Sequence, residues 1–302
     1  MSQNSYLNPN SGFGDEALIA GASDTYAHRL MRAGWTALVP TDKLAELSTA
    51  ALSTARQLFA LPYERKRSFA RPDLGGHVGW RDSSREDRPE EVWQIQVSNE
   101  TEDWPMELYA ERRALNHLGV LCARITKHLL AALVNIIDDP EISQRLGTCV
   151  SHERTIVRLL HYQPRLNSLS FAPHTDLGIT TIFAGETISA LELEEEHGLW
   201  VTPDSQLVLA AGEILAACTR NRVRPGQHRV RSVQEERWAV AVFVHPEPNY
   251  EIGFDAKGLP ITAQAFFERS MAAYSQEGSD PTPMHEETSD TQNGCRTKLS
   301  TL

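Results

Sequence analysis

The stretch that decides the fold runs from Phe171 to Phe183 and reads FAPHTDLGITTIF. Its second half is β-branched or aromatic, which is typical of a β-strand. Its first half places His174 and Asp176 two positions apart, and side chains at this spacing in an extended strand point to the same side. An imidazole and a carboxylate could therefore reach one metal ion. We expect Gly178 to mark a kink or a close approach just after them.

A third ligand must come from a different strand. His228 follows the turn signal Pro225-Gly226, so we expect it to open a strand. Two imidazoles and one carboxylate fill one face of an octahedral ion and leave the other open for O₂ and an organic co-substrate, as in non-heme Fe(II) oxygenases. No cysteine lies near these residues, which argues against a zinc site rich in cysteine or an iron–sulfur site. The His-x-Asp pair alone is a weak signal, because surface patches contain it too.

Arg237 strengthens the metal hypothesis. Residues 236–243 read as the next strand, and a hairpin between about residues 229 and 237 is expected to bring Arg237 near the metal. A guanidinium grips a carboxylate through two parallel hydrogen bonds, which suits the distal carboxylate of a keto-acid co-substrate. Taken alone, an arginine is more often an ordinary salt-bridge partner.

The order of predicted elements indicates a mixed fold. Helical periodicity covers residues 24–34, 42–60 and 106–136. From Thr155 onward the chain alternates in short segments: 155–162, 168–174, 179–184, 190–193, 199–202, 206–210, 214–218, 228–232 and 237–244. Many short strands with turn signals predict a two-sheet jelly roll or barrel. The fold class is therefore α+β, with flanking helices.

Four regions follow from this pattern. Residues 1–23 are expected to be mobile, and residues 24–150 form a helical region with early strands packed on the barrel. Residues 151–274 form the core. The tail, 275–302, has few apolar residues and is expected to be flexible, with folding over the active-site mouth as the alternative.

The composition limits the partners. The chain has 302 residues and a net charge of −11, which argues against nucleic acid or an anionic membrane. Neither a long apolar run nor a secretory signal is evident, and the four cysteines are scattered, so we expect a cytoplasmic protein with reduced thiols. The oligomeric state stays open.

These motifs resemble the isopenicillin N synthase-like family of Fe(II)/2-oxoglutarate-dependent dioxygenases, from about Tyr26 to Tyr250. The matching segments are RAGW (32–35), LFALPYERK (58–66), GGHVGW (75–80), RPEEVWQI (88–95) and VRLLHYQP (157–164). Arg237-Trp238-Ala239 and HPEPNY (245–250) are also similar to microbial relatives of the ethylene-forming enzyme. The resemblance implies a double-stranded β-helix (jelly-roll) core.

The resemblance also implies roles for single residues. His174, Asp176 and His228 would bind iron, Arg237 would hold 2-oxoglutarate, and Tyr162 would contact it. Two positions depart from the family pattern: Leu160 stands where an Asn is frequent, and Ala239 where many members have Ser. The lost hydroxyl removes one hydrogen bond to the keto acid, a net loss of about 1 kcal/mol.

The implied reaction uses Fe(II), 2-oxoglutarate and O₂, releases succinate and CO₂, and oxidises a small-molecule metabolite by hydroxylation, desaturation or cyclisation. An inward arginine or histidine would favour an acidic or amino-acid-like substrate of secondary metabolism. The candidate substrate contacts are His77, Trp80, Arg81, Gln94, Gln96, Arg158 and His161. For each of them an ordinary structural role, in the core or in a surface ion pair, is the competing interpretation.

Two alternative functions share the scaffold. One is an oxidase of the same fold that uses no keto acid, as isopenicillin N synthase itself does. The other is a non-catalytic metal-binding protein. Three ligands together with a clamp arginine argue against the second, because binding alone does not require them.

Overall fold

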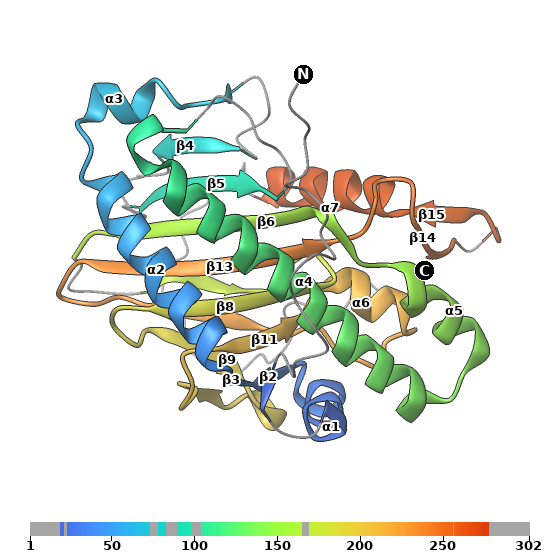
Figure 1. Ribbon diagram of the computed structural model, residues 1–302. Helices are drawn as coiled ribbons and strands as arrows, with labels where there is room; N and C mark the ends of the chain where they lie inside the picture. The colour runs from blue at the N-terminus through green and yellow to red at the C-terminus, as the bar shows by residue number, and fades with distance from the viewer. Residues whose placement is uncertain are drawn as a thin grey trace, which may run out of the picture.

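Two antiparallel sheets form the core of the computed structural model, which describes residues 19–20, 23–72, 78–82, 90–97, 104–164, 169–255 and 257–277 (Figure 1). The large sheet has the order β2 (Trp35–Ala37), β11 (Val208–Ala211), β8 (Thr180–Glu186), β13 (Arg237–His245), β6 (Ser151–Tyr162), β5 (Glu90–Gln96) and β4 (Gly79–Asp82). The small sheet has the order β10 (Trp200–Val201), β9 (Leu191–Glu194), β12 (His228–Arg231) and β7 (Leu169–His174). Side chains of both sheets pack together, as Trp35 and Val208 do with Leu191, which confirms the jelly-roll prediction.

The outer face of the large sheet is covered by helices. In Figure 1, α2 (Asp42–Phe59) and α4 (Tyr109–Ile137) cross in front of it, and α1 (Ser23–Ala33) lies at its lower end. The three predicted helices are thereby confirmed. The apolar stripe of α4 is buried along its length, against α1, α2 and β6. By length and hydropathy Met106–Ile137 could also cross a membrane, but more than half of that apolar window is buried inside the protein, as in a core helix.

Smaller elements complete the described chain. The short strands β1 (Ile19–Ala20) and β3 (Val39–Pro40) form one pair, and β14 (Glu251–Phe254) and β15 (Pro260–Thr262) form another. The remaining helices are α3 (Tyr63–Arg67), η2 (Met106–Leu108), α5 (Pro140–Thr148), η3 (Glu196–Gly198), α6 (Glu213–Cys218) and α7 (Ala263–Glu277). The predicted mobile terminus (1–23) and flexible tail (275–302) lie largely outside the described residues, and both stay predictions.

Two expectations about local structure are wrong. Residues 214–218 form helix α6 rather than a strand, because Ala, Leu and Glu favour helix and the turn at Gly212 leads directly into it. The expected hairpin before Arg237 does not form: β12 and β13 belong to different sheets. The chain crosses between the layers, so Arg237 approaches the site from the opposite sheet.

Alternation along the strands sorts the side chains into two groups. On β6 and β13, Tyr162 pairs with Arg237 and Leu160 with Ala239, and these four side chains line a pocket between the sheets. The intervening pair, His161 and Trp238, stacks on the opposite face, toward the helices. A residue's parity on its strand therefore decides whether it can reach the site.

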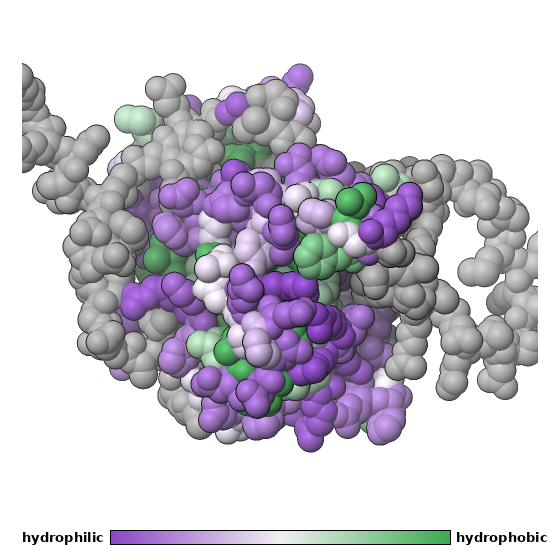
Figure 2. Space-filling view, turned by 90° about the vertical axis from the view of Figure 1, so that its right-hand side faces the viewer, coloured by the Kyte–Doolittle hydropathy of each residue, from purple (hydrophilic) through white to green (hydrophobic). Residues whose placement is uncertain are grey.

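The surface is largely polar. Figure 2 shows one face, predominantly hydrophilic with scattered apolar residues, as a net charge of −11 leads one to expect. Large apolar side chains that are exposed in the described part of the chain are Val39, Tyr63, Met106, Tyr109, Leu199, Phe254, Leu259 and Met271.

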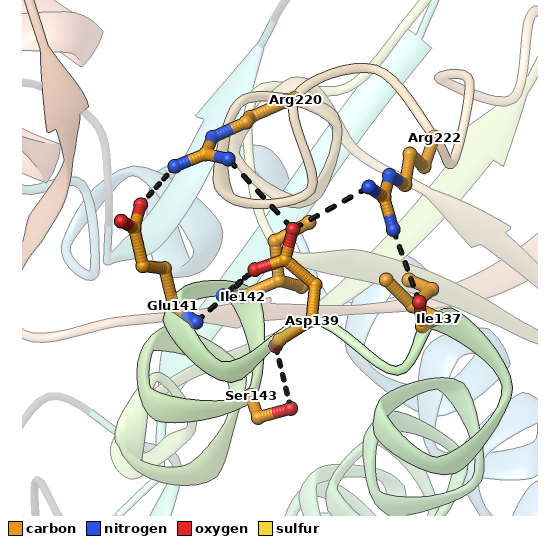
Figure 3. A network of polar contacts seen from close by, with 7 residues as sticks. All are labelled: Ile137, Asp139, Glu141, Ile142, Ser143, Arg220 and Arg222. Carbon is orange, nitrogen blue, oxygen red and sulfur yellow. Dashed lines mark hydrogen bonds and ion pairs between the residues drawn. The ribbon is translucent and has the colours of Figure 1, made fainter.

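Asp139 joins α5 to the segment after α6 (Figure 3). Its carboxylate accepts hydrogen bonds from the backbone N–H groups of Glu141 and Ile142, which caps α5. The same carboxylate forms ion pairs with Arg220 and Arg222 at 3.7 and 3.4 Å. The hydrogen bond from Ile142 and the two arginines hold the pKa of Asp139 below its usual range.

We predict that Asp139→Ala lowers the melting temperature and that Asp139→Asn, which keeps a capping oxygen, lowers it less. Because the folded-state pKa is depressed, the stabilisation is present above the unfolded pKa and is lost as the pH falls through the folded value. The difference between wild type and Asp139→Ala should thus be constant near neutral pH and shrink below about pH 4. Thermal unfolding followed by circular dichroism tests this, and a pH-independent difference would contradict it.

Candidate metal centre and co-substrate pocket

Strand pairing brings the three predicted ligands together. His174 ends β7 and His228 opens β12, as predicted, and the two are direct partners across the antiparallel ladder. Asp176 lies just beyond β7. One donor atom from each of these residues falls within 4.8 Å of the others, the His174 Nε2–Asp176 Oδ1 distance being 3.9 Å and the His228 Nε2–Asp176 Oδ2 distance 3.6 Å. Two imidazole nitrogens and a carboxylate oxygen on one side of a common point fit a divalent iron ion.

Both imidazoles are oriented by the backbone. His174 Nδ1 lies 2.9 Å from the carbonyl oxygen of Ala172, and His228 Nδ1 lies 3.1 Å from that of Gly226. Because a carbonyl only accepts, each Nδ1 carries the proton and each Nε2 has its lone pair available for a metal. The backbone two residues before each histidine thereby selects the tautomer that a metal ligand needs.

Asp176 is held by two hydrogen bonds, one to its carboxylate and one to its backbone carbonyl. The Thr181 hydroxyl donates to Asp176 Oδ2 at 2.5 Å, and the N–H of Glu213 donates to the Asp176 carbonyl at 2.8 Å. Two glycines allow the backbone to pass close by. A Cβ on Gly178 would lie 2.9 Å from the carbonyl oxygen of Val244, and one on Gly212 would lie 2.0 Å from that of Gly178. The predicted close approach at Gly178 is confirmed.

Charges shape the protonation of the site. Burial alone raises the pKa of Asp176, but His228, His174, the Thr181 hydroxyl and Arg158 together bring it below its usual range. Glu213 shows the opposite balance: burial and the nearby charge of Asp176 raise its pKa, despite a hydrogen bond from Thr175. Asp176 is therefore the ionised carboxylate, which a metal ligand must be.

A pocket beside the triad contains the predicted co-substrate residues. Arg237 is 3% exposed, and its guanidinium lies over the ring of Tyr162, 4.6 Å from the centroid. Its Nη1 is buried with no hydrogen-bond partner among the described residues. A buried unpaired donor is costly, so a carboxylate that accepts from it has a ready site. Leu160 and Ala239, the two departures from the family pattern, both line this pocket.

Glu186 is a residue of this pocket that the sequence did not reveal. Its Oε2 accepts from Arg237 Nε at 3.0 Å and from Nη2 at 2.5 Å, so one edge of the guanidinium is occupied. An acidic residue at the end of a strand has no signature of its own, and only the register of β8 with β13 places it opposite Ala239.

Two predicted substrate residues face the site. Gln94 of β5 pairs with Arg158 of β6 on the inner face, and Arg158 Nε donates to its side-chain oxygen. The Arg158 guanidinium lies over Phe243, 4.4 Å from the ring centroid. Phe243 is the register partner of Thr181, the residue bonded to Asp176. This chain of neighbours places Arg158 on the same side of the sheet as the triad.

Two other predicted substrate residues lie on the face of the large sheet that points away from the triad. His161 and Trp80 belong to the helix side of the large sheet, where Glu91 accepts from the Trp80 indole at 3.1 Å and lies 3.1 Å from His161 Nδ1. Lys66 also donates to Glu91. Burial would raise the pKa of Glu91, but its hydrogen bonds with His161, Lys66 and Trp80 lower it. The competing structural interpretation is correct for both, because odd and even positions of a strand point apart.

By strand register, Gln96 and Arg81 share the face of Gln94, on the two strands at one edge of the large sheet. Gln96 donates to the carbonyl of Glu153 at 2.8 Å, and Arg81 is exposed on β4. His77 lies outside the described residues.

Known proteins resemble this chain in sequence and fold. Residues 151–246 match the family model of the 2OG-Fe(II) oxygenase superfamily. The 2-oxoglutarate-dependent dioxygenase ecdK of Aspergillus rugulosus is 28% identical, over 70% of this chain and 72% of that protein. Proline hydroxylase buaE of Petromyces alliaceus is 22% identical, over 72% of this chain and 78% of that protein. A full-length Neurospora crassa protein, crystallised in complex with alpha-KG, has a similar fold: TM-score 0.67, 19% identity, 83% of this chain and 89% of that one covered.

The family match over residues 151–246, the named relatives and the shared fold support a 2-oxoglutarate-dependent Fe(II) oxygenase, which uses Fe(II), 2-oxoglutarate and O₂. These similarities agree with the predicted enzyme class and cofactors. They favour this class over both the keto-acid-independent oxidase and the non-catalytic protein. The similarities do not single out the isopenicillin N synthase-like branch, which stays a prediction.

We predict that His174→Ala removes the metal site. Under anaerobic conditions, wild-type protein with Fe(II) and 2-oxoglutarate should develop a metal-to-ligand absorption band, and the variant should lack it because a third of the donor set is gone. Metal affinity should fall by more than about a hundredfold, beyond the effect of losing an outer hydrogen-bond partner. His128→Ala, at an exposed position of α4, is the control and should keep the band. A band that survives in His174→Ala would place the site elsewhere.

Thr181→Val should lower metal affinity by about ten- to a hundredfold, because Asp176 loses the hydroxyl that orients it. Thr180→Val is a matched control: this neighbour faces the helices, and its hydroxyl bonds to Thr126 at 2.7 Å. It should reduce stability but not metal affinity. Mn(II) titration by calorimetry compares the two, and equal affinities would contradict the assignment.

Proposed function

We propose that this enzyme binds iron through His174, Asp176 and His228 and holds 2-oxoglutarate with Arg237 and Tyr162. Its second substrate is a small metabolite of secondary metabolism that carries a carboxylate, as an amino acid does. The observation that carries this proposal is the position of Arg158: a cation on the inner face, close enough to the triad to lower the pKa of Asp176. The name of one relative, a proline hydroxylase, agrees with an amino-acid-like substrate.

The bound iron supplies the redox chemistry that couples the conversion of 2-oxoglutarate and O₂ into succinate and CO₂ to oxidation of the substrate. The chain's own residues supply orientation. The Nη1 group of Arg237 donates to the distal carboxylate of the keto acid, and the Tyr162 ring supports the guanidinium. The apolar walls at Leu160 and Ala239 keep water from competing for that hydrogen bond.

Arg158 orients the second substrate. Phe243 and Gln94 fix its guanidinium in place, and a guanidinium held in this way loses little entropy when it binds an anion. A carboxylate bound there would place the neighbouring carbon atoms of the substrate toward the triad. Hydroxylation, desaturation and cyclisation all remain outcomes of such a pose, because each begins from a C–H bond held near the iron.

Succinate release in the presence of a panel of amino acids and other carboxylic acids tests the substrate class, with the corresponding amides as controls. We predict that Arg158→Gln raises KM for an accepted acid by about ten- to a hundredfold, as expected for a lost charge-assisted hydrogen bond. Turnover of 2-oxoglutarate without substrate should change little.

Arg154→Gln is the matched control. Arg154 lies on the same strand but at an exposed position, where it pairs with Glu247 at 3.0 Å. It should leave KM unchanged. A preference for amides, or an unchanged KM in Arg158→Gln, would contradict the proposed recognition.

A further inference from the structure

The side-on edge of Arg237 is already taken by the protein. Glu186 Oε2 accepts from Nε at 3.0 Å and from Nη2 at 2.5 Å, and the Ile188 carbonyl accepts from Nε at 3.2 Å. The side chains of Arg237 and Glu186 are 4% and 13% exposed. A guanidinium usually binds a carboxylate through two parallel hydrogen bonds. In Arg237, the Nε and Nη2 donors of such a pair already bind Glu186.

Glu186 is itself held in place. The backbone N–H groups of Ala190 and Leu191 donate to its two oxygens at 3.2 and 3.3 Å. These bonds come from the turn that leads into β9, so the small sheet anchors a carboxylate that projects from the large one. With four donors around it, the Glu186 side chain is firmly held and does not simply yield its place to a ligand.

The donor that remains is Arg237 Nη1, and both side chains line the same pocket. A keto acid must then approach the end of the guanidinium, beside a second carboxylate. We propose that Glu186 is a positioning residue that orients Arg237 end-on toward 2-oxoglutarate and, through its charge, weakens the grip on the distal carboxylate. This inference rests on the proposed role of Arg237.

Such an arrangement serves release as well as binding. Succinate keeps the distal carboxylate of 2-oxoglutarate, so a clamp that binds this group too tightly also retains the product. A neighbouring negative charge lowers the affinity for both, because two carboxylates near one guanidinium repel each other in a site with little water. Glu186 thus favours release of succinate after each turnover.

The test compares Glu186→Gln and Glu186→Ala in the Mn(II)-loaded protein, titrated with 2-oxoglutarate by calorimetry. Glutamine retains an oxygen for Arg237 but not the charge, so we expect the Kd to fall by about tenfold. Alanine also frees Arg237 to move, so we expect it to bind about tenfold more weakly than glutamine does. Pyruvate, a keto acid without the distal carboxylate, should bind wild type and both variants alike.

Glu192→Gln is the matched control, because Glu192 is 12% exposed and pairs with Arg229 and Arg231 away from the pocket. Its Kd for 2-oxoglutarate should equal that of wild type. The proposed effect of the Glu186 charge is overturned if Glu186→Gln binds 2-oxoglutarate no more tightly than wild type does. It is also overturned if the variant binds pyruvate more tightly by the same factor. Equal affinities in the two Glu186 variants overturn the positioning role. Wild-type protein that fails to bind 2-oxoglutarate would instead refute the proposed function.

Discussion

The pairing of β7 with β12 is the constraint on which the rest of the site depends. It sets His174 and His228 opposite each other, and the carbonyls of Ala172 and Gly226 then aim both Nε2 atoms at one point. A slip of one residue in this register would turn one imidazole to the other face of the sheet. The metal site is thus a consequence of strand register more than of any single side chain.

The large sheet carries the second half of the chemistry. Thr181 fixes the carboxylate ligand, while Arg237 and Arg158 place two cations on the same inner face. Burying such charges is unfavourable unless each is paired or has an anion to bind. Glu186 pairs with one and Gln94 accepts from the other, and the buried Nη1 of Arg237 remains for a ligand. The inner face of the large sheet therefore presents cationic groups to which an anionic ligand could bind.

Local patterns predicted much of this accurately. The His-x-Asp spacing and the long helical stripe over residues 106–136 are properties of short segments, and the structure confirms them. His228 opens a strand as predicted, although Pro225-Gly226 before it is irregular backbone rather than a turn. The failures are of a different kind. His161 and Trp80 were candidates because their segments were expected to face the iron, yet both side chains face the helices. Their neighbours Arg158 and Gln94 face inward.

The sequence by itself determined the enzyme class, because three ligands and a clamp arginine in this order meet the electronic needs of non-heme iron and little else. It could not determine which of two adjacent strand residues points inward, or that β12 and β13 lie in opposite sheets. It also gave no sign that Glu186 would meet Arg237, 51 positions away. Those facts follow from strand register and sheet packing, which long-range contacts decide and short sequence motifs do not encode.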